Sequence, residues 1–529
     1  MTIIIYDIPG RMEMANFTDG NTNVCGLIGN PVRHTLSPLI HNSLAEITGI
    51  NMVYVPFEVA DGDVSDAIKG ALALGIRGLN VTIPYKSDVI PCLEDIDPLA
   101  KGIGAVNNLV RTPNGGYNGY NKDMTGLYHS MQDEGVELDG RIVVILGAGG
   151  VARPAAFLCA SKGAKKVYVL NRTYERAMDV ASEVNRALYD VNRDDIVTAD
   201  GINAEGDPLD IPVIVVPMKI EDYKDLYEEK EKFITLQCTS VGLFPDVNSA
   251  IIEDSEFYEH VSVGIDMVYR PLETKFMKLT AEAGAKAISG LKMLLYQAID
   301  AYELWFANEL LTEAQNYAEE KETSGDKRTG EDKNSVSISK EQADEIYKSL
   351  VMDVTGARNI ILEGFMGSGK TTVSEILADK LDLELLDTDA AIVEAEGRSI
   401  NDIFEKDGEE SFRDMETALL ETASSEHFRE MVISLGGGLV LRKENRELLQ
   451  KLGKVVYLRT SPETVYERVK FDDSRPLLKT ADPLSKIREM QSERSSIYEL
   501  AADCIIDTDD LTPAEIADRI IEELGIIIV

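Results

Sequence analysis

Cysteine, positive charge and long apolar runs are all scarce in this chain of 529 residues. The five cysteines are scattered without a Cys-x-x-Cys pair, so neither a disulfide framework nor a zinc site is indicated. Lys and Arg number 53 against 92 Asp and Glu, and the net charge of -39 opposes non-specific binding to nucleic acid or to an anionic membrane. No apolar run approaches a membrane span, and the apolar start reaches Asp7 too soon for a signal peptide. We therefore expect a cytoplasmic protein without nucleic-acid or membrane partners.

The length of the chain and one polar stretch predict several domains. A chain of 529 residues is too long for one ordinary core, and its 44% hydrophobic residues suffice for globular folding. Residues 318–335 contain almost no apolar side chains, which is typical of a flexible linker. A short helix is expected after it, near residues 340–352. Residues 1–23 fit no element clearly, and we treat them as an N-terminal extension.

Residues 364–371 fit the phosphate-binding pattern G-x-x-x-x-G-K-[ST] at every fixed position. They follow the apolar run 359–362 and precede a helical pattern, which is the context that the motif requires. The glycines allow backbone N–H groups to surround a polyphosphate, Lys370 can reach the outer phosphates, and Thr371 can hold Mg²⁺. The sequence therefore predicts a nucleotide-binding loop with contacts from Gly367, Ser368, Gly369, Lys370, Thr371 and Thr372.

Between residue 24 and about residue 125, short apolar runs alternate with amphipathic stretches, which predicts an α/β unit. Polar side chains cluster just beyond the expected strand ends, and they are Thr35, Ser37, Asn80, Thr82, Lys86, Asn107 and Asp123. Lys86 and Asp123 are the best pair among them for moving a proton, because a neighbouring carboxylate can fix the position of a lysine. On spacing alone, a surface role for Lys86 and a helix-capping role for Asp123 stay equally open.

A second glycine-rich motif, G-x-G-x-x-[GA] at residues 147–152, follows the apolar run 141–146. Another strand is expected at residues 166–170, at the distance that a βαβ dinucleotide-binding unit requires. Further strands at 212–216, 233–236 and 261–265 would complete a doubly wound sheet. The expected nucleotide contacts in the turn are those of Gly147, Ala148, Gly149 and Gly150.

The end of the strand 166–170 indicates which dinucleotide is bound. An Asp or Glu there would bind a ribose 2′-hydroxyl, but the chain has Asn171, Arg172 and Thr173, with Arg176 one turn further on. Two guanidinium groups suit a 2′-phosphate, so NADP is favoured over NAD. The alternative is that both arginines only solvate the start of a helix.

Residues 24 to about 310 resemble a shikimate dehydrogenase. The resemblance rests on G-N-P-V-R-H-T-L-S-P at 29–38, N-V-T-I-P-Y-K at 80–86 and G-A-V-N at 104–107, and it continues in the family's order at 119–123, 147–150, 171–173 and 290–297. It implies that Lys86 and Asp123 are the catalytic pair. It also implies that Met267 and Gly290 flank the nicotinamide, and that the substrate is held by Thr35, Ser37, Asn80, Thr82, Asn107, Tyr269 and Gln297.

Two residues depart from the pattern of that family. Thr35 stands where the family usually has Ser, which leaves quinate open beside shikimate as a substrate. Gln237 stands where Asn usually precedes the turn Thr239-Ser240-Val241-Gly242.

The segment after residue 371 supplies groups for a small-molecule phosphoryl acceptor, which needs a carboxylate near its hydroxyl and arginines for an anionic group. Asp387 and Asp389 follow the apolar run 383–386, and further apolar runs at 432–435, 455–458 and 504–506 predict parallel strands. The other candidates are Arg413, Gly437, Arg475 and Arg494. Each alone is more often a cap, a turn or a solvated side chain.

Together these residues resemble shikimate kinase over residues 358–515. The resemblance implies that Asp389 receives the acceptor hydroxyl, and that Asp387 acts on Mg²⁺ together with Thr371. It implies that Arg475 reaches over the ATP phosphates, and that shikimate is bound by Arg413, Gly437 and Arg494. The two resemblances support each other, because the product of the first reaction is the acceptor of the second.

We therefore predict an α/β protein with two enzyme activities. The expected domains are an α/β substrate domain at 24–125 with 290–317, a Rossmann NADP domain at 126–289, a charged linker with a short helix at 318–355, and a P-loop kinase domain with a parallel sheet at 356–529. The expected reactions are reduction of 3-dehydroshikimate by NADPH and phosphorylation of shikimate by MgATP. The alternatives are a quinate dehydrogenase in the first half, or one half that only senses a ligand.

Overall fold

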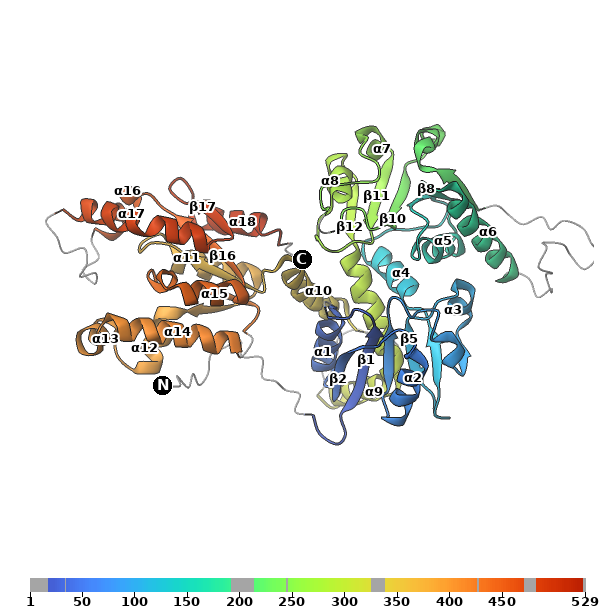
Figure 1. The fold of residues 1–529 in the computed structure, drawn as a ribbon, viewed down its shortest axis with the longest axis horizontal. Coiled ribbons are helices and arrows are strands. Elements are labelled where there is room, and N and C mark those ends of the chain that lie inside the picture. Colours follow the sequence, from blue (N-terminus) through green and yellow to red (C-terminus); the bar gives the residue numbers. More distant parts are fainter. Residues whose placement is uncertain are drawn as a thin grey trace, which may run out of the picture. The chain divides into compact units, whose positions relative to one another are not determined.

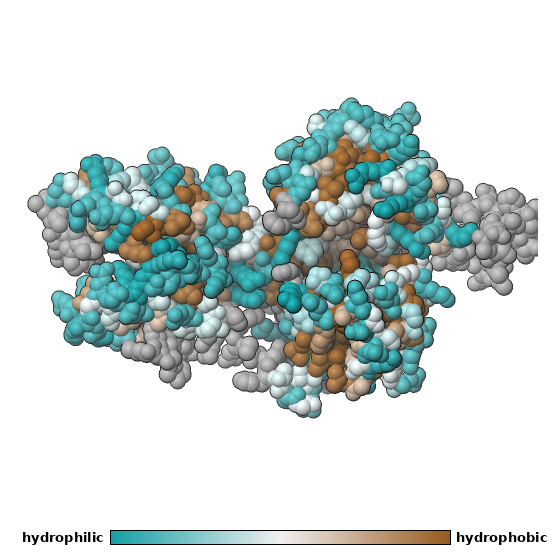
Figure 2. All heavy atoms as spheres, in the orientation of Figure 1, coloured by the Kyte–Doolittle hydropathy of each residue, from teal (hydrophilic) through white to brown (hydrophobic). Residues whose placement is uncertain are grey.

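The computed structural model describes residues 18–33, 35–191, 214–243, 246–324, 338–425, 428–470 and 482–526. This part of the chain forms two compact units, a first unit up to Leu350 and a second unit from Val351 (Figure 1). Hydrophilic residues cover most of the visible face of both units, in agreement with the acidic composition (Figure 2). Across these ranges, every helix is too short or too polar to cross a bilayer.

The first lobe of the first unit is built on a six-stranded sheet in the order β2-β1-β3-β5-β6-β4. Its strands are β1 (Asn23–Gly29), β2 (Met52–Glu58), β3 (Gly78–Val81), β4 (Asp95–Ile96), β5 (Asn108–Arg111) and β6 (Tyr117–Tyr120). The helices are α1 (Ser37–Thr48), α2 (Val64–Ala73), α3 (Pro98–Ile103) and the 3-10 turn η1 (Ile90–Cys92). The strand and helix alternation predicted up to residue 83 is confirmed. β5 runs antiparallel to both β3 and β6, and sequence analysis did not predict this pair because each strand has only four residues.

The second lobe is a six-stranded, fully parallel sheet in the order β12-β11-β10-β7-β8-β9. Its strands are β7 (Ile142–Leu146), β8 (Lys166–Asn171), β9 (Val215–Lys219), β10 (Phe233–Gln237), β11 (Val261–Asp266) and β12 (Lys286–Ser289). Between them lie α5 (Ala152–Ser161), α6 (Tyr174–Val191), η2 (Ile220–Glu228), α7 (Ser255–Glu259) and α8 (Lys275–Glu282). The chain reverses direction across the sheet between β7 and β10, which is the switch point where dinucleotides bind in this Rossmann order.

Two helices, α4 (Asp123–Asp133) and α9 (Gly290–Ser324), pack against each other and join the two lobes. Gly126 permits the close approach, because a Cβ there would overlap the backbone of Gln297. Lys292 of α9 forms an ion pair of 2.6 Å with Asp133 and also bonds to Glu134. Helix α9 continues to Ser324, inside the stretch 318–335 that the sequence assigned to the linker.

The helix α10 (Lys340–Thr355) contains the boundary between the units. Its first half belongs to the first unit: Lys340 Nζ lies 2.7 Å from Asp133 Oδ1, and the ring of Tyr347 lies 5.5 Å from Lys292 Nζ. The amide N–H of Ile338, just before the helix, donates to Glu303 Oε1 at 2.8 Å. The start of α10 confirms the predicted short helix, and these contacts attach it to α4 and α9.

The second unit is a five-stranded parallel sheet in the order β14-β15-β13-β16-β17. Its strands are β13 (Asn359–Glu363), β14 (Glu384–Asp387), β15 (Met431–Ser434), β16 (Lys454–Arg459) and β17 (Cys504–Asp507). The helices are α11 (Lys370–Leu381), α12 (Thr388–Glu396), α13 (Ile400–Asp407), α14 (Glu409–Ser425), η3 (Leu439–Leu441), α15 (Lys443–Leu452), α16 (Pro462–Val469), α17 (Pro483–Ala501) and α18 (Pro513–Glu523). One core packs α11 and α18 on Ile360 and Leu362, and another packs α15 and α17 on Ile361. The parallel sheet that the apolar runs predict is confirmed.

Candidate active sites

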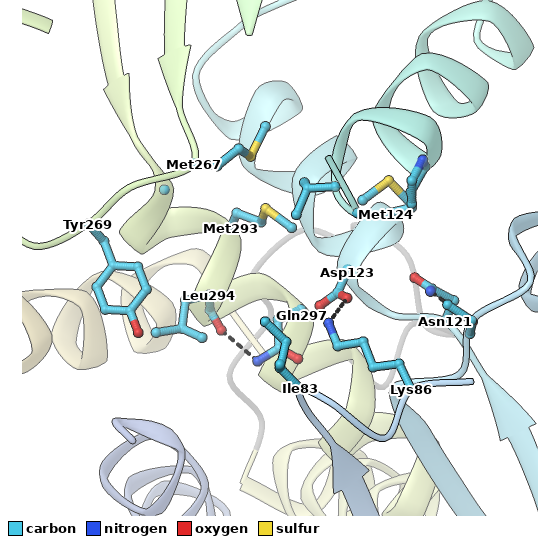
Figure 3. Close-up of a pocket in the computed structure, with 15 residues that line it drawn as sticks. Ile83, Lys86, Asn121, Asp123, Met124, Met267, Tyr269, Met293, Leu294 and Gln297 are labelled. Carbon is cyan, nitrogen blue, oxygen red and sulfur yellow. Dashed lines mark hydrogen bonds and ion pairs between the residues drawn. The ribbon is translucent and has the colours of Figure 1, made fainter. Parts of the chain in front are cut away.

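A cavity of about 410 Å³ lies between the two lobes of the first unit. Side chains from the first lobe, from α4, from the turn after β7 and from α9 all reach it (Figure 3). Its lining includes Ile83, Lys86, Asn121, Asp123, Met124, Gly150, Val151, Met267, Tyr269, Gly290, Met293 and Gln297. The cavity thus brings the expected proton-transfer pair, part of the expected substrate site and the dinucleotide turn together.

Lys86 and Asp123 point toward each other in this cavity (Figure 3). Lys86 Nζ donates to Asp123 Oδ2 at 2.6 Å, and the two side chains are 30% and 23% exposed. The segment after β3 positions Lys86, whose carbonyl accepts from Val106 N–H at 2.8 Å. Asp123 is the first residue of α4, where the helix dipole favours a carboxylate. The helix has no side-chain cap, so the capping alternative for Asp123 is wrong.

Tyr269 and Gln297, two of the expected substrate ligands, line the cavity. Gln297 Nε2 donates to the carbonyl of Leu294 at 3.0 Å, which leaves its amide oxygen for another partner. The remaining candidates, Thr35, Ser37, Asn80, Thr82 and Asn107, are not among the lining residues.

Those remaining candidates sit at strand ends and helix starts of the first lobe. Thr35 Oγ1 donates to Ser37 Oγ at 3.1 Å at the start of α1. Asn80 is buried and accepts from Tyr54 Oη at 2.7 Å. Asn107 is also buried, and its Oδ1 accepts from the amide of Lys122 at 2.6 Å. The last bond holds the residue before Asp123, so Asn107 helps to position the start of α4.

The glycine-rich turn lies between β7 and α5, as predicted. Gly147 has φ +107, and a Cβ there would overlap the methyl group of Thr239, so the turn after β10 approaches it closely. Gln237 organises that second turn: its Oε1 accepts from the N–H and the hydroxyl of Thr239, both at 2.7 Å, and its Nε2 donates to the carbonyl of Val241 at 2.9 Å. Although Gln replaces the usual Asn at position 237, its side chain still closes the turn.

The residues expected to choose NADP follow β8 on the same edge of the sheet. Asn171 Nδ2 donates to the carbonyl of Thr173 at 2.9 Å, which shapes the bend into α6. Arg172 and Arg176 are exposed, and no carboxylate pairs with either of them within the described ranges. Both guanidinium groups are therefore placed where a phosphate ester could reach them.

Asp266 at the end of β11 is a positioning residue that sequence analysis missed. It is fully buried, accepts from Val268 N–H at 2.9 Å and from Thr274 Oγ1 at 2.6 Å, and so shapes the segment that carries Met267 and Tyr269. Burial raises the pKa of its carboxyl to about 6. The sequence signal that could have identified Asp266 is an Asp at the end of an apolar strand.

The phosphate-binding loop of the second unit lies between β13 and α11. Gly364, Gly367 and Gly369 have φ +150, +76 and +98, a region that favours glycine. Lys370 Nζ donates to the carbonyls of Gly364 at 2.8 Å and Phe365 at 3.2 Å. Arg468 of α16 donates to the carbonyl of Ser368 at 3.1 Å, and no sequence motif singled it out.

Asp387 and Asp389 lie where β14 leads into α12. Asp387 Oδ1 accepts from the N–H groups of Asp389 and Ala390, both at 3.1 Å, so it caps α12. Asp389 lies in the first turn of that helix and faces the glycine segment after β15, because a Cβ on Gly436 would overlap Asp389 Oδ1.

No group of three or more His, Cys, Asp or Glu side chains within the described ranges could hold a metal. Mg²⁺ bound through phosphates needs only one or two protein oxygens, which Thr371 and Asp387 could supply.

Arg413 of α14 faces the same glycine segment. Its guanidinium group pairs with Glu416 at 2.8 Å and Glu409 at 2.9 Å, and a Cβ on Gly438 would overlap it. Glu416 is fully buried, and burial raises the pKa of its carboxyl to about 7 although Arg413 lowers it. Sequence analysis missed Glu416, whose only signal is its place one turn after Arg413.

Gly437 and Arg494 are connected through Tyr498. Tyr498 Oη donates to the carbonyl of Gly437 at 2.6 Å, and Arg494, one turn earlier on α17, lies close enough for its charge to oppose the burial that raises the pKa of this phenol. Asp389, Arg413, Gly437 and Arg494 are thus grouped around the segment after β15. Arg475 lies outside the described residues.

Three family models match the chain. Residues 27–109 match the shikimate dehydrogenase substrate-binding domain, residues 130–199 match shikimate/quinate 5-dehydrogenase, and residues 366–525 match shikimate kinase.

Curated proteins and solved structures match the first unit. The shikimate dehydrogenase (NADP⁺) of Moorella thermoacetica is 38% identical over 289 residues, which cover 55% of this chain and 90% of the relative. That of Methanosarcina mazei is 36% identical over 284 residues, covering 53% and 92%. A chorismate mutase/shikimate 5-dehydrogenase fusion protein from Clostridium acetobutylicum is similar in structure, with 28% identity, a TM-score of 0.49, and coverage of 63% of this chain and 99% of that one.

These matches confirm that the two halves come from two enzyme families. The chain belongs to the shikimate dehydrogenase family and carries a shikimate kinase after it, which makes it a bifunctional enzyme of the shikimate pathway.

Proposed function

We propose that residues 24–317 reduce 3-dehydroshikimate to shikimate with NADPH, and that residues 356–529 transfer the γ-phosphoryl group of MgATP to the 3-hydroxyl of shikimate. The observation that carries the first assignment is the Lys86–Asp123 pair, joined at 2.6 Å in a cavity that also touches Gly150 of the dinucleotide turn. The hydroxyl made by the first reaction is then the one that the second reaction uses.

In the reduction, bound NADPH supplies the hydride, and the protein supplies the proton and the geometry. Lys86 as an ammonium group donates a proton to the oxygen of the reacting carbonyl, while Asp123 keeps Lys86 Nζ oriented toward that oxygen. Tyr269 and Gln297, which line the same cavity, hold substrate hydroxyl and carboxylate groups. Thr35, Ser37, Asn80, Thr82 and Asn107 complete the substrate site from the first lobe. Met267 and Gly290 flank the nicotinamide.

The cofactor of this half is proposed to be NADP. The curated relatives are NADP⁺ enzymes by name, and Arg172 and Arg176 offer two exposed cations at the end of β8. Gly147, Ala148, Gly149 and Gly150 are proposed to bind the pyrophosphate at the start of α5, and a Cβ on Gly150 would meet nothing within 4 Å.

In the kinase, the chain binds two anionic ligands and aligns them. The loop from Gly367 to Thr372 surrounds the phosphates, and Lys370 exchanges its carbonyl partners for phosphate oxygens. Thr371 and Asp387 would hold Mg²⁺, and Arg475, which lies outside the described residues, is proposed to bind the phosphates. Asp389 orients the attacking hydroxyl and accepts its proton, while shikimate itself is bound by Arg413, Gly437 and Arg494.

Quinate is a second candidate substrate of the first half. Thr35 carries a methyl group that the usual Ser lacks, and its hydroxyl contacts Ser37 at 3.1 Å, so the contacts to the substrate carboxylate differ from those of the usual pair. A half that only senses its ligand is disfavoured, because Lys86, Asp123, Lys370 and Asp389 are all retained.

We keep the predicted domain boundaries as a proposal, except that α9 continues to Ser324 and the boundary between the units lies within α10. The cytoplasm is the proposed compartment because the cysteines are free and dispersed. Small molecules are the partners that the two families imply. The net charge of -39 supports the further proposal that nucleic acid and membranes are not partners.

The test is an assay of both reactions on the full chain. NADPH consumption with 3-dehydroshikimate and ADP release with shikimate are measured separately. In a parallel assay of the reverse reaction of the first half, oxidation by NADP⁺, quinate is compared with shikimate as the substrate. We expect both activities, with quinate oxidised more slowly. Absence of NADPH consumption in a protein that still releases ADP would contradict the first assignment alone.

A further inference from the structure

Glu363 ends β13 and immediately precedes the phosphate-binding loop. Its side chain is 1% exposed, and neither carboxyl oxygen has a hydrogen-bond partner among the residues that the structure describes. An ionised carboxyl group loses its hydration when it is buried, and this cost is large when no partner replaces the water. The proposed kinase mechanism does not use this carboxyl, so its position requires a separate explanation.

The sheet register shows which face Glu363 occupies. Ile360 and Leu362 belong to one core of the second unit and Ile361 to the other, so Glu363 shares a face with Ile361. Its neighbour across the sheet is Tyr457 of β16. The titratable and charged groups that act on it are Lys370 of α11, Arg446 of α15, Tyr457 of β16 and Tyr498 of α17, while Arg468 of α16 contacts the loop itself.

Glu363 also lies where the nucleotide loop meets the acceptor segment. The carbonyl of Gly364 accepts from Lys370 Nζ at 2.8 Å. A Cβ on Gly437 would lie 3.7 Å from that carbonyl and 3.7 Å from the amide of Met366. The carbonyl of Gly437 accepts from Tyr498 at 2.6 Å. A charge on Glu363 would therefore act at once on Lys370, on the phosphate-binding loop at Gly364 and on the acceptor segment at Gly437.

Burial raises the pKa of Glu363 to about 8, although the nearby cations Lys370 and Arg446 lower it. The uncharged form of the side chain is therefore favoured at neutral pH. This state fits the lack of an ion-pair partner within the described ranges.

We propose that Glu363 is a positioning residue of the kinase, an acid that stays uncharged under the phosphate-binding loop and, once ionised, keeps Lys370 away from the phosphates. A carboxylate at this place would compete with the polyphosphate for the Lys370 ammonium group and would repel the phosphates directly. The neutral acid does neither. Binding of MgATP therefore selects the protonated form, and at alkaline pH it draws one proton from solution. The proposal rests on the loop binding ATP phosphates.

The first experiment compares the full chain with its Glu363→Gln variant, measuring kinase kcat and KM for MgATP between about pH 6 and pH 9.5. Near pH 7 the variant should match the unsubstituted protein, because an amide resembles the neutral acid. Above about pH 8, the KM of the unsubstituted protein should rise by up to about tenfold per pH unit, while that of the variant should rise less. Glu384→Gln is the matched control, because burial also raises the pKa of Glu384. Glu384 lies at the amino end of β14, whereas the phosphate-binding loop lies at the carboxyl ends of the strands.

The second experiment measures the proton uptake directly. Titration calorimetry with Mg²⁺ and a non-hydrolysable ATP analogue, in two buffers of different ionisation enthalpy, measures the protons taken up on binding. We expect uptake approaching one proton near pH 9 for the unsubstituted protein and less for Glu363→Gln.

Three results would overturn the proposal: no proton uptake, the same alkaline profile in Glu363→Gln as in the unsubstituted protein, or loss of ATP affinity in the variant at pH 7. The last result would mean that the charged carboxylate is required. A protein that phosphorylates no shikimate at any pH would refute the kinase assignment instead, while NADPH oxidation reports on the folding of the other unit.

Discussion

The two sites of this protein differ in what their charged groups do before a ligand arrives. In the dehydrogenase, Lys86 and Asp123 already contact each other inside a cavity. In the kinase, Lys370 is bonded to loop carbonyls and Arg413 to carboxylates of its own helix. The first site is therefore arranged for the chemical step, whereas the cations of the second must exchange partners when anions bind. Substitutions should accordingly affect turnover in the first site and either binding or turnover in the second.

The largest effect is expected for Lys86→Met, which removes the proton donor and keeps an unbranched side chain that is one atom shorter. Loss of a general acid typically lowers turnover 10² to 10⁴-fold. Reduction of 3-dehydroshikimate should fall by that amount, and phosphorylation of added shikimate should stay normal. A parallel fall of both activities, in a protein still folded by circular dichroism, would show that the two sites are not independent.

In the kinase, Asp389→Asn should lower turnover by a similar 10² to 10⁴-fold while ATP affinity is retained. The amide keeps the shape of the carboxylate but accepts no proton, and residues 364–371 are unchanged. Asp387→Asn is the contrasting variant, and its main effect should be weaker binding of Mg²⁺, so that activity needs a higher Mg²⁺ concentration. If Asp389→Asn lost ATP affinity, its role would move from the acceptor to the metal.

A smaller and more selective effect is expected when Arg172 and Arg176 are both replaced by Gln. Each charge-assisted bond to a 2′-phosphate is worth roughly 1.5 to 3 kcal/mol, so KM for NADPH should rise strongly and KM for NADH should barely change. Lys162→Gln is a suitable control, since that cation lies over the ring of Tyr128 at 4.2 Å. Equal losses for both cofactors would remove the assignment of NADP to these arginines.

The last effect concerns stability and pH, and it should run in opposite directions for Glu363 and Glu416 of the second unit and for Asp133 of the first unit. Burial raises the pKa of Glu363 and of Glu416 to about 8 and about 7. The unfolded chain loses these protons near the ordinary pKa of about 4.5, so the folded second unit binds more protons, and its stability falls as pH rises from about 5 to 8.

In the first unit, burial acts to raise the pKa of Asp133, but bonds from Lys292 and Lys340 outweigh it and leave the pKa below 3.8. That stability is present above pH 4 and is lost in acid. Thermal unfolding of the full chain at several pH values, with NADPH or MgATP added to identify each transition, should separate the two trends. One pKa unit corresponds to ~1.4 kcal/mol. If the unfolding temperatures of the two units rose or fell together as the pH changed, the expected opposite trends would be contradicted.

The sequence predicted the features that depend on local chemistry. Both glycine-rich loops, and the polar residues that end neighbouring parallel strands, are found where the patterns put them, because strand, loop and helix follow one another within a few residues. The short pair β5 and β6 was not predicted, since four residues carry too little periodicity. Asp266, Glu416 and Arg468 were also missed. Their partners are fixed by tertiary packing, as for Arg468 with a carbonyl a hundred positions earlier.

Helix α10 has a practical consequence for anyone who wishes to obtain the two enzymes as separate proteins. The polar stretch 318–335 suggests itself as the cleavage point. A dehydrogenase fragment ending there would lack the amide of Ile338, from which Glu303 accepts, and the ammonium group of Lys340, one of the two that pair with Asp133. A kinase fragment starting at residue 356 would in turn lack Met352, which is buried in the core of the second unit. The two fragments should therefore overlap, and both should contain residues 338–355.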